Sequence, residues 1–159
     1  MTLQTRVLDD DMLTLTLAQE LKEAGLAWRP RDRDAFIVPY RGLDDTVFVI
    51  TNMATRVQLL QGYPTVTFQG AYDWALDYIF LREVVWMPSE AQLRAEIERR
   101  VRSGQKERGP TLRLTSMSGG YVCEINDRGS YLTFSGQNPS IAYAHALLHL
   151  LGRDVQRDN

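Results

Sequence analysis

Two histidines near the end of the chain are the residues best spaced to do chemistry. His145 and His149 stand four apart in a stretch with helical periodicity, so both rings could hold one metal ion or one anion. The intervening residues are Ala, Leu and Leu, so the glutamate of the metalloprotease pattern is missing. No third ligand is evident, and both rings could simply reach outward from neighbouring leucines. A small metal-dependent enzyme at this pair is therefore an alternative, and we predict no metal or other cofactor.

Other side chains that could do chemistry are sparse. Asp73 with Asp77, and Asp32 with Asp34, could share a hard cation, although solvated surface acids explain both pairs better. Cys123, the only cysteine, lies in an expected strand with no histidine nearby in sequence, which favours a small buried hydrophobe over a nucleophile. The Gly-x-Ser-x-Gly elbow, the dinucleotide glycine motif and the P-loop are all missing from the sequence. An ATPase is excluded, and an enzyme of any kind is disfavoured.

A basic cluster around residue 100 offers a surface for nucleic acid. Its members are Arg94, Arg99, Arg100, Arg102, Lys106 and Arg108. Glutamates interrupt the cluster, and the whole chain carries a net charge of −2, so no long-range field gathers polyanions. Nucleic-acid binding through Arg94, Arg99, Arg100 and Arg102 is an alternative function, and nucleic acid is a disfavoured partner.

The bulk composition indicates an ordinary globular protein. The chain has 159 residues, of which 44% are apolar and 24% charged, enough for one domain with a substantial core. Three consecutive acids at 9–11 speak against a secretory signal, and no window of eighteen apolar residues occurs. The single cysteine excludes a disulfide within the monomer and fits a reducing compartment. We therefore expect a cytoplasmic protein without a membrane partner.

Periodicity predicts helices and strands in the first half of the chain. Leucines recur at helical spacing over 13–24, with Thr16 and Gln19 as a capping box and Gly25 as the stop. Strands are predicted at 35–38, 46–50, 55–60 and 65–68, the last two joined by a Gln-Gly-Tyr-Pro turn. A helix rich in large rings is predicted over 71–81.

The second half has clearer start and stop signals. Ser89 and Gln92 form a second capping box, which opens a helix with a stripe of Leu93, Ile97 and Val101. Strands at 111–115, 121–125 and 131–134 follow, joined by tight-turn residues, and a last helix begins at Asn138 and ends at 152. Together these elements predict an α+β fold, a single two-layer sandwich in which amphipathic helices cover a mostly antiparallel sheet. The predicted domain spans 12–152, with polar tails at 1–11 and 153–159.

Three segments of the chain also form a recognisable set. They are Leu17–Trp28 (LAQELKEAGLAW), the stretch 84–93 (VVWMPSEAQL) and Ala142–Leu151 (AYAHALLHLL). This set resembles a family of short uncharacterised bacterial and prophage-encoded proteins, whose longer members also carry the segments seen here at 47–50 and 73–77. The last third is similar to phage αβα sandwich domains. The resemblance implies a fold and carries over no catalytic residue. Some longer relatives bear a pilus-assembly label that properly denotes an ATPase, and this chain lacks its phosphate loop.

The leading functional hypothesis is a non-catalytic cytoplasmic interaction module. The chain has three tryptophans and seven tyrosines, side chains that are enriched at interfaces. We expect Trp28, Trp74, Tyr78 and Trp86 to be the anchors, although core packing explains each tryptophan better when it is taken separately. Self-association is the simplest form of this hypothesis, which makes a protein partner or a homo-oligomer the expected assembly.

Overall fold

The computed structural model divides the chain into two compact units. It describes residues 4–7, 10, 12–40, 44–50, 56–60, 62–67, 78–102, 112–127 and 129–155. One unit combines Met1–Leu8 with Ala27–Met87, and the other combines Asp9–Leu26 with Pro88–Asn159. We call them unit 1 and unit 2. The single domain over 12–152 stays a prediction.

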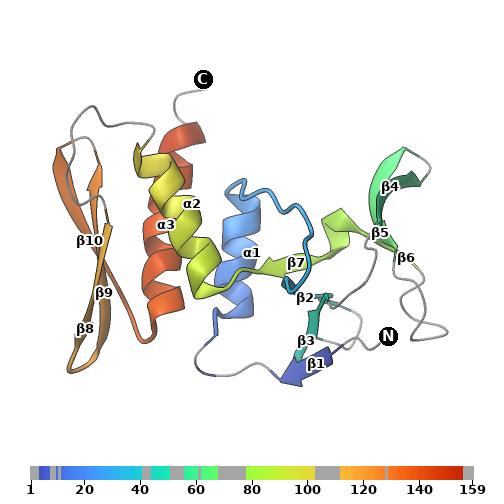
Figure 1. Ribbon diagram of the computed structural model, residues 1–159, viewed down its shortest axis with the longest axis horizontal. Coiled ribbons are helices and arrows are strands. Elements are labelled where there is room, and N and C mark those ends of the chain that lie inside the picture. Colours follow the sequence, from blue (N-terminus) through green and yellow to red (C-terminus); the bar gives the residue numbers. More distant parts are fainter. Residues whose placement is uncertain are drawn as a thin grey trace. The chain divides into compact units, whose positions relative to one another are not determined.

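The fold belongs to the α+β class, as the sequence predicts (Figure 1). Three α-helices are present in the described residues: α1 (Leu15–Glu23), α2 (Glu90–Arg102) and α3 (Pro139–Val155). Every pairing between described strands is antiparallel, and the strands form three separate sheets.

Unit 1 contains a four-stranded sheet with the order β1-β3-β2-β7. Its strands are β1 (Gln4–Val7), β2 (Ala35–Ile37), β3 (Thr46–Val49) and β7 (Val85–Met87). The side chains of Phe36, Ile37, Val47 and Ile50 are fully buried and form its core. The strand β1 lies within 1–11, which the sequence predicts to be a polar tail. Pairing with β3 makes Gln4–Val7 a strand, although the residues of this segment give no strand signal of their own.

A second sheet of unit 1 corrects the predicted helix over 71–81. Its strands are β4 (Arg56–Leu60), β5 (Tyr63–Thr67) and β6 (Tyr78–Phe80), and β6 leads into a short 3-10 turn at Leu81–Glu83. The helix prediction is therefore wrong from Tyr78 onward, and 71–77 lies outside the described residues. Large rings suit a strand as well as a helix, and pairing with β5 decides between them.

Unit 2 is built around α3. A three-stranded sheet with the order β10-β9-β8 consists of β8 (Leu112–Met117), β9 (Gly120–Asp127) and β10 (Ser130–Gly136). The helix α3 packs against β9, β10, α1 and α2, as Figure 1 shows. Residues on several sides of α3 are consequently buried, including Ala142, Ala144 and Leu147. A central position explains why this helix is apolar nearly all round.

The ends of α1 and α2 follow local sequence signals. The first helix is capped by Thr14, whose hydroxyl accepts a hydrogen bond from the Leu17 amide, and not by Thr16 as predicted. It ends as predicted at Gly25, which has φ of 96°, and the amide of Leu26 folds back to donate to the Leu21 carbonyl. The predicted capping box of Ser89 and Gln92 opens α2.

Asn138 connects the start of α3 to the start of unit 2. Its side-chain carbonyl caps α3 by accepting from the Ile141 amide at 2.9 Å. Its amide nitrogen donates to the carbonyls of Asp10 and Met12 at 2.7 and 3.2 Å. One buried side chain therefore satisfies groups that are more than a hundred residues apart in the sequence.

Candidate interaction surface

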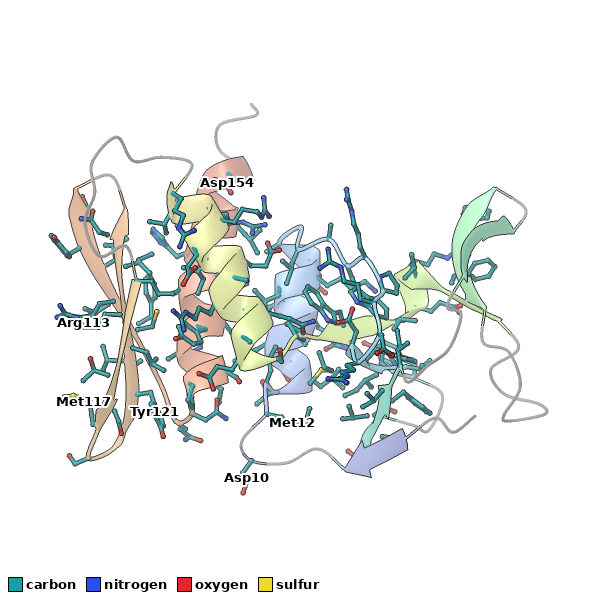
Figure 2. All side chains as sticks on the ribbon, viewed as in Figure 1. Asp10, Met12, Arg113, Met117, Tyr121 and Asp154 are labelled. Carbon is teal, nitrogen blue, oxygen red and sulfur yellow. The ribbon has the colours of Figure 1, made fainter. Side chains whose placement is uncertain are left out.

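The sheet of unit 2 has one covered face and one open face. Cys123 and Ile125 of β9 point to the covered face and are almost fully buried, because α2 and α3 pack there. Figure 2 shows Arg113 and Met117 on the side of the sheet that faces away from these helices. On this open face Tyr131 is 73% exposed and Met117 is 59% exposed. These two residues lie at opposite ends of the face, because Tyr131 is opposite Asn126 and Met117 is opposite Gly120, so they are two single exposed side chains and not one contiguous patch.

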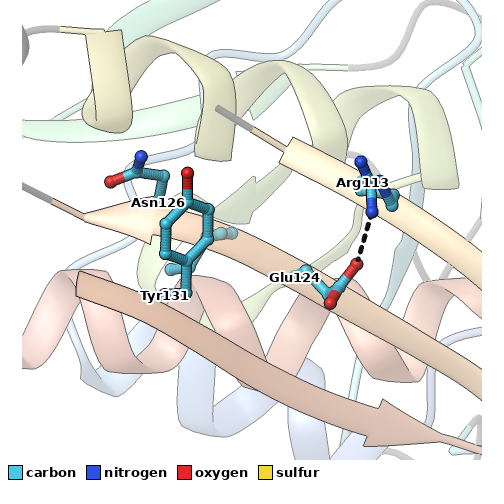
Figure 3. Close-up of a pocket in the computed structure, with 5 residues that line it drawn as sticks. Arg113, Glu124, Asn126 and Tyr131 are labelled. Atoms are coloured by element: carbon cyan, nitrogen blue, oxygen red, sulfur yellow. Dashed lines mark ion pairs between the residues drawn. The ribbon is translucent and has the colours of Figure 1, made fainter. Parts of the chain in front are cut away.

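A small hollow lies on the open face (Figure 3). It has a volume of about 120 Å³ and is lined by Arg113, Glu124, Ile125, Asn126 and Tyr131. Ligand pockets for drug-sized molecules are larger, roughly 300–1,000 Å³. The hollow therefore fits a single side chain of a partner better than it fits a small-molecule substrate.

The charges at the hollow cancel. Arg113 of β8 and Glu124 of β9 are register partners, and Nη1 of the arginine lies 3.6 Å from Oε2 of the glutamate (Figure 3). The pair is largely exposed, so it contributes little to stability. Its consequence is a neutral patch, which does not repel a second copy of the same surface.

The strand β10 forms one edge of this sheet. Ser130 is paired with Asp127 across two intervening residues, the arrangement in which the closing pair exchanges hydrogen bonds. Because antiparallel bonding alternates, the main-chain groups of Tyr131, Thr133 and Ser135 point away from β9. Nδ1 of His145 lies 2.8 Å from the Ser135 carbonyl oxygen, which agrees with a carbonyl that points away from β9. A carbonyl only accepts, so Nδ1 of His145 carries the proton.

Both candidate metal ligands of the sequence contact β10. His145 is held by Ser135 as described, and the ring of His149 lies 5.5 Å from the ring of Phe134. Both histidines are exposed at the flank of α3. Within the described ranges no group of three or more His, Cys, Asp and Glu side chains comes together. The metal hypothesis therefore gains no third ligand from these residues.

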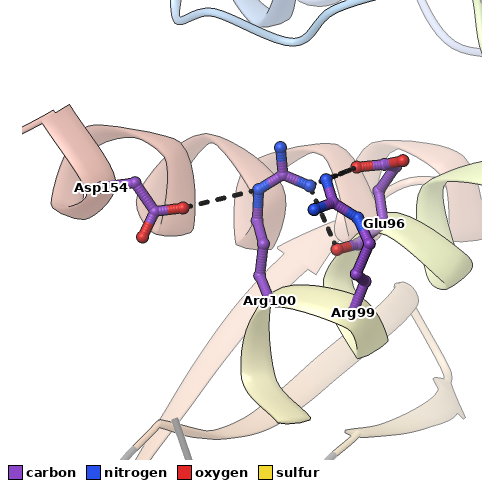
Figure 4. A network of polar contacts seen from close by, with 4 residues as sticks. All are labelled: Glu96, Arg99, Arg100 and Asp154. Atoms are coloured by element: carbon purple, nitrogen blue, oxygen red, sulfur yellow. Dashed lines mark hydrogen bonds and ion pairs between the residues drawn. The ribbon is translucent and has the colours of Figure 1, made fainter. Parts of the chain in front are cut away.

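The arginines of α2 are paired with acids of their own helix. Arg94 and Arg102 contact Glu98 at 2.9 and 3.2 Å. Figure 4 shows the second group, in which Glu96 accepts from Arg99 at 2.8 Å and also from Arg100. Such i,i+3 and i,i+4 pairs stabilise the exposed face of a helix without any partner. Lys106 and Arg108 lie outside the described residues.

Arg100 differs from the other three arginines because it is enclosed. Its side chain is only 11% exposed, and Nε lies 3.6 Å from Oδ2 of Asp154 on α3. That distance is too long for a hydrogen bond and suits an ion pair between the two helices. Burial alone would raise the pKa of Glu96, but hydrogen bonds from Arg99 and Arg100 outweigh it and lower that pKa. The network therefore joins α2 to α3. Glu96 and Asp154 neutralise the arginine charges, so little positive charge remains to attract a phosphate backbone.

The structure gives Trp28 a role within unit 1. Its indole nitrogen donates to Oδ2 of Asp34 at 2.9 Å, and its ring lies 5.7 Å from that of Phe36. Asp34 also accepts from the amide of Arg31, and only 2% of it is exposed. Its expected place among solvated surface acids is therefore wrong, because the carboxylate is buried and accepts hydrogen bonds from Trp28 and Arg31.

The remaining predicted anchors are described only in part. Trp86 lies in β7 opposite Phe36 and is half-buried, and its indole nitrogen is enclosed without a hydrogen-bond partner. The main chain of Tyr78 is paired in β6, and nothing is described of its side chain. Trp74, Asp73 and Asp77 lie outside the described residues.

Cys123 lies on the covered face of the sheet and is fully buried. Burial raises the pKa of its thiol from 9.0 to about 12, and the charge of Glu124 adds to the shift. The thiolate is the nucleophilic form of cysteine, so this side chain is unreactive near neutral pH. The sequence-based expectation of a small buried hydrophobe is confirmed by its complete burial.

Sequence reasoning overlooked Tyr131 and its neighbours on the open face. The signal is present in β10, where Tyr131, Thr133 and Ser135 alternate with the more buried Leu132 and Phe134. This period of two assigns the three residues to one face of the strand. It does not reveal that the face is left uncovered, because that depends on where the helices pack.

Two further findings concern membrane spans and similarity to known proteins. No helix in the described part is long and apolar enough to cross a membrane. The family resemblance seen in the sequence stays a prediction, since the chain matches no family model, no curated protein and no solved structure.

Proposed function

We propose that this protein is a non-catalytic cytoplasmic interaction module that self-associates through the sheet of unit 2. The observation that carries the proposal is the open sheet face, where Tyr131 is 73% exposed and Met117 is 59% exposed. Tyrosine and methionine are enriched at protein interfaces relative to the rest of the surface. Tyr131 lies on β10 and Met117 lies on β8, which are the two edge strands of this sheet. An approaching partner therefore meets both these side chains and the strand edges.

The electrostatics of the open face favour a second copy of the chain. Arg113 and Glu124 neutralise each other, and the whole chain carries a net charge of only −2. Like surfaces therefore meet without strong repulsion. The cytoplasmic location rests on the sequence, in particular on its single cysteine.

Self-association is tested by the molar mass of the full chain in solution. Light scattering coupled to size exclusion, at protein concentrations from about 5 to 500 μM, should report a mass that rises from monomer towards dimer. Tyr131→Ala should weaken the dimer by about tenfold, because an exposed aromatic at an interface contributes on the order of 1–2 kcal/mol. The matched control is Tyr40→Ala, which removes a tyrosine of unit 1 that is 88% exposed.

The outcome that contradicts the proposal is equally direct. A monomer at every concentration, together with identical masses for Tyr131→Ala and the wild type, removes self-association. Loss of dimer in the Tyr40→Ala control instead would place the interface on unit 1 and not on the open sheet face.

A further inference from the structure

We propose that the edge of β10 is the dimer contact, and that it pairs antiparallel with β10 of a second copy around Thr133. This inference rests on the self-association proposed above and adds the surface and the register. It yields one continuous sheet across two copies of unit 2.

The edge of β10 lacks the devices that keep strands apart. Proteins protect exposed edges with charged residues, prolines, bulges, very short strands or a covering helix, and among the described residues α3 hydrogen-bonds to this edge only through His145 at the Ser135 carbonyl. The seven residues of β10 (SYLTFSG) include no charge and no proline, and they pair with β9 without a bulge. Tyr, Leu, Thr and Phe also favour extended structure, so this edge is well suited to accept another strand.

The main chain of β10 offers free groups in the correct direction. Tyr131, Thr133 and Ser135 direct their N–H and C=O groups away from β9, and no other described strand pairs with them. His145 occupies one lone pair of the Ser135 carbonyl, and the second lone pair stays available. An antiparallel partner centred on Thr133 meets each of these groups with a complementary one.

The side chains of this edge are complementary to themselves. Pairing around Thr133 sets Thr133 opposite its own copy and Tyr131 opposite Ser135 of the other copy. Paired threonines and an aromatic residue are favourable cross-strand neighbours, and no like charges face each other. A two-fold contact needs such a self-complementary surface, which is why the occupant is a second copy of this chain.

The size of the contact predicts a weak dimer. A single strand pair with flanking side chains lies below the 1,200–2,000 Å² or so that stable interfaces bury. Association is therefore expected to depend strongly on protein concentration.

A pair of lysine substitutions tests the edge. Thr133 and Thr115 are both exposed threonines on the open face, one in β10 and one in β8 at the opposite edge. Thr133→Lys puts two ammonium groups face to face and should weaken the dimer at least tenfold, whereas Thr115→Lys should leave it within twofold of the wild type. Thermal unfolding of both variants checks that the fold is retained.

A cysteine pair supplies a positive signal from the same positions. Thr133→Cys should form an intermolecular disulfide under mild oxidation, because directly opposed residues of paired strands lie within disulfide reach. Thr115→Cys should stay monomeric on a non-reducing gel. The native Cys123 is fully buried and does not interfere.

The outcomes separate this inference from the proposed function. A wild-type dimer that survives Thr133→Lys overturns the β10 edge and leaves self-association standing. A dimer broken by Thr115→Lys places the contact at the β8 edge and also overturns the inference. A wild type that stays monomeric at all concentrations overturns both.

Discussion

At the residue scale, Asn138 has two distinct tasks. It caps α3 through the Ile141 amide and donates to the carbonyls of Asp10 and Met12. Asn138→Ala should lower the free energy of unfolding by about 1–3 kcal/mol, since it removes a helix cap and takes the donor away from two part-buried carbonyls. Urea denaturation followed by circular dichroism measures the change.

Asn138→Asp is the control for this prediction. It keeps an acceptor for the helix cap and removes the donor to the two carbonyls, so most of the loss should persist. Full recovery of stability in Asn138→Asp would show that the connection to Asp10 and Met12 contributes nothing.

The raised pKa of the Cys123 thiol predicts that the free energy of unfolding depends on pH. Its thiol pKa is raised from 9.0 to about 12 in the folded chain, so the folded state holds the proton over a range in which the unfolded state releases it. The free energy of unfolding therefore keeps the full contribution of the protonated thiol below about pH 9, and it loses this contribution as the pH rises from about 9 to 12. The pKa of Tyr143 is also raised, by burial first and then by Cys123, and adds to the loss above pH 10.

Comparison with Cys123→Ala isolates the thiol. The free energy of unfolding should fall between pH 8 and 10.5 in the wild type and fall less steeply in Cys123→Ala. Removing the buried sulfur also lowers this free energy, but by the same amount at each pH, so the slopes can still be compared. Equal slopes for the two proteins would mean that this thiol ionises alike in the folded and unfolded states.

At the element scale, the contact of α3 with β10 depends on a glycine. A Cβ atom added at Gly136 would lie 2.4 Å from the Ala142 nitrogen and 2.9 Å from the Ile141 Cβ, both on the helix. Gly136→Ala should therefore force α3 away from β10 and cost more than about 2 kcal/mol of stability. Gly119→Ala, which meets nothing within 4 Å, should be nearly neutral. Equal unfolding midpoints in urea would contradict the close packing.

The arginines of α2 should differ sharply in their contribution. Arg100 is 11% exposed and links Glu96 to Asp154, so Arg100→Ala should cost about 1–3 kcal/mol. Arg99 contacts the same glutamate from a side chain that is 66% exposed, and Arg99→Ala should cost no more than about 0.5 kcal/mol. Thermal unfolding of the two variants measures the difference, and equal losses would show that Arg100 does not join the helices.

Local signals predicted the end of α1 and the start of α2, but they placed the cap of α1 at Thr16 where Thr14 caps it. They also failed where strand pairing decides the structure. Gly25 and the capping box of Ser89 and Gln92 lie where the sequence placed them, because both act within one helical turn. The pattern of large rings predicts a helix at Tyr78, whereas this residue lies in β6, since pairing with β5 overrides a pattern that suits either structure. Its residue type predicts an exposed Asp34, whereas the carboxylate is buried and accepts hydrogen bonds from Trp28 and Arg31.

At the scale of the whole molecule, the candidate interaction surface could be predicted only in part. The alternation of Tyr131, Thr133 and Ser135 is readable from the sequence as one face of a strand. That β10 is an edge strand, and that its face is open, follows from the strand order and from the position of α3. Neither is encoded in local periodicity, so the sequence favoured the tryptophans instead.

The exchange of main-chain amide protons tests the central claim most directly. In the monomer the N–H of Thr133 points away from β9, while that of Phe134 is bonded to it, so the two neighbouring amides form an internal comparison. If β10 pairs with a second copy, protection of the Thr133 amide should rise with protein concentration towards that of Phe134. A Thr133 amide that exchanges rapidly at every concentration, while Phe134 stays protected, would contradict self-association through this edge.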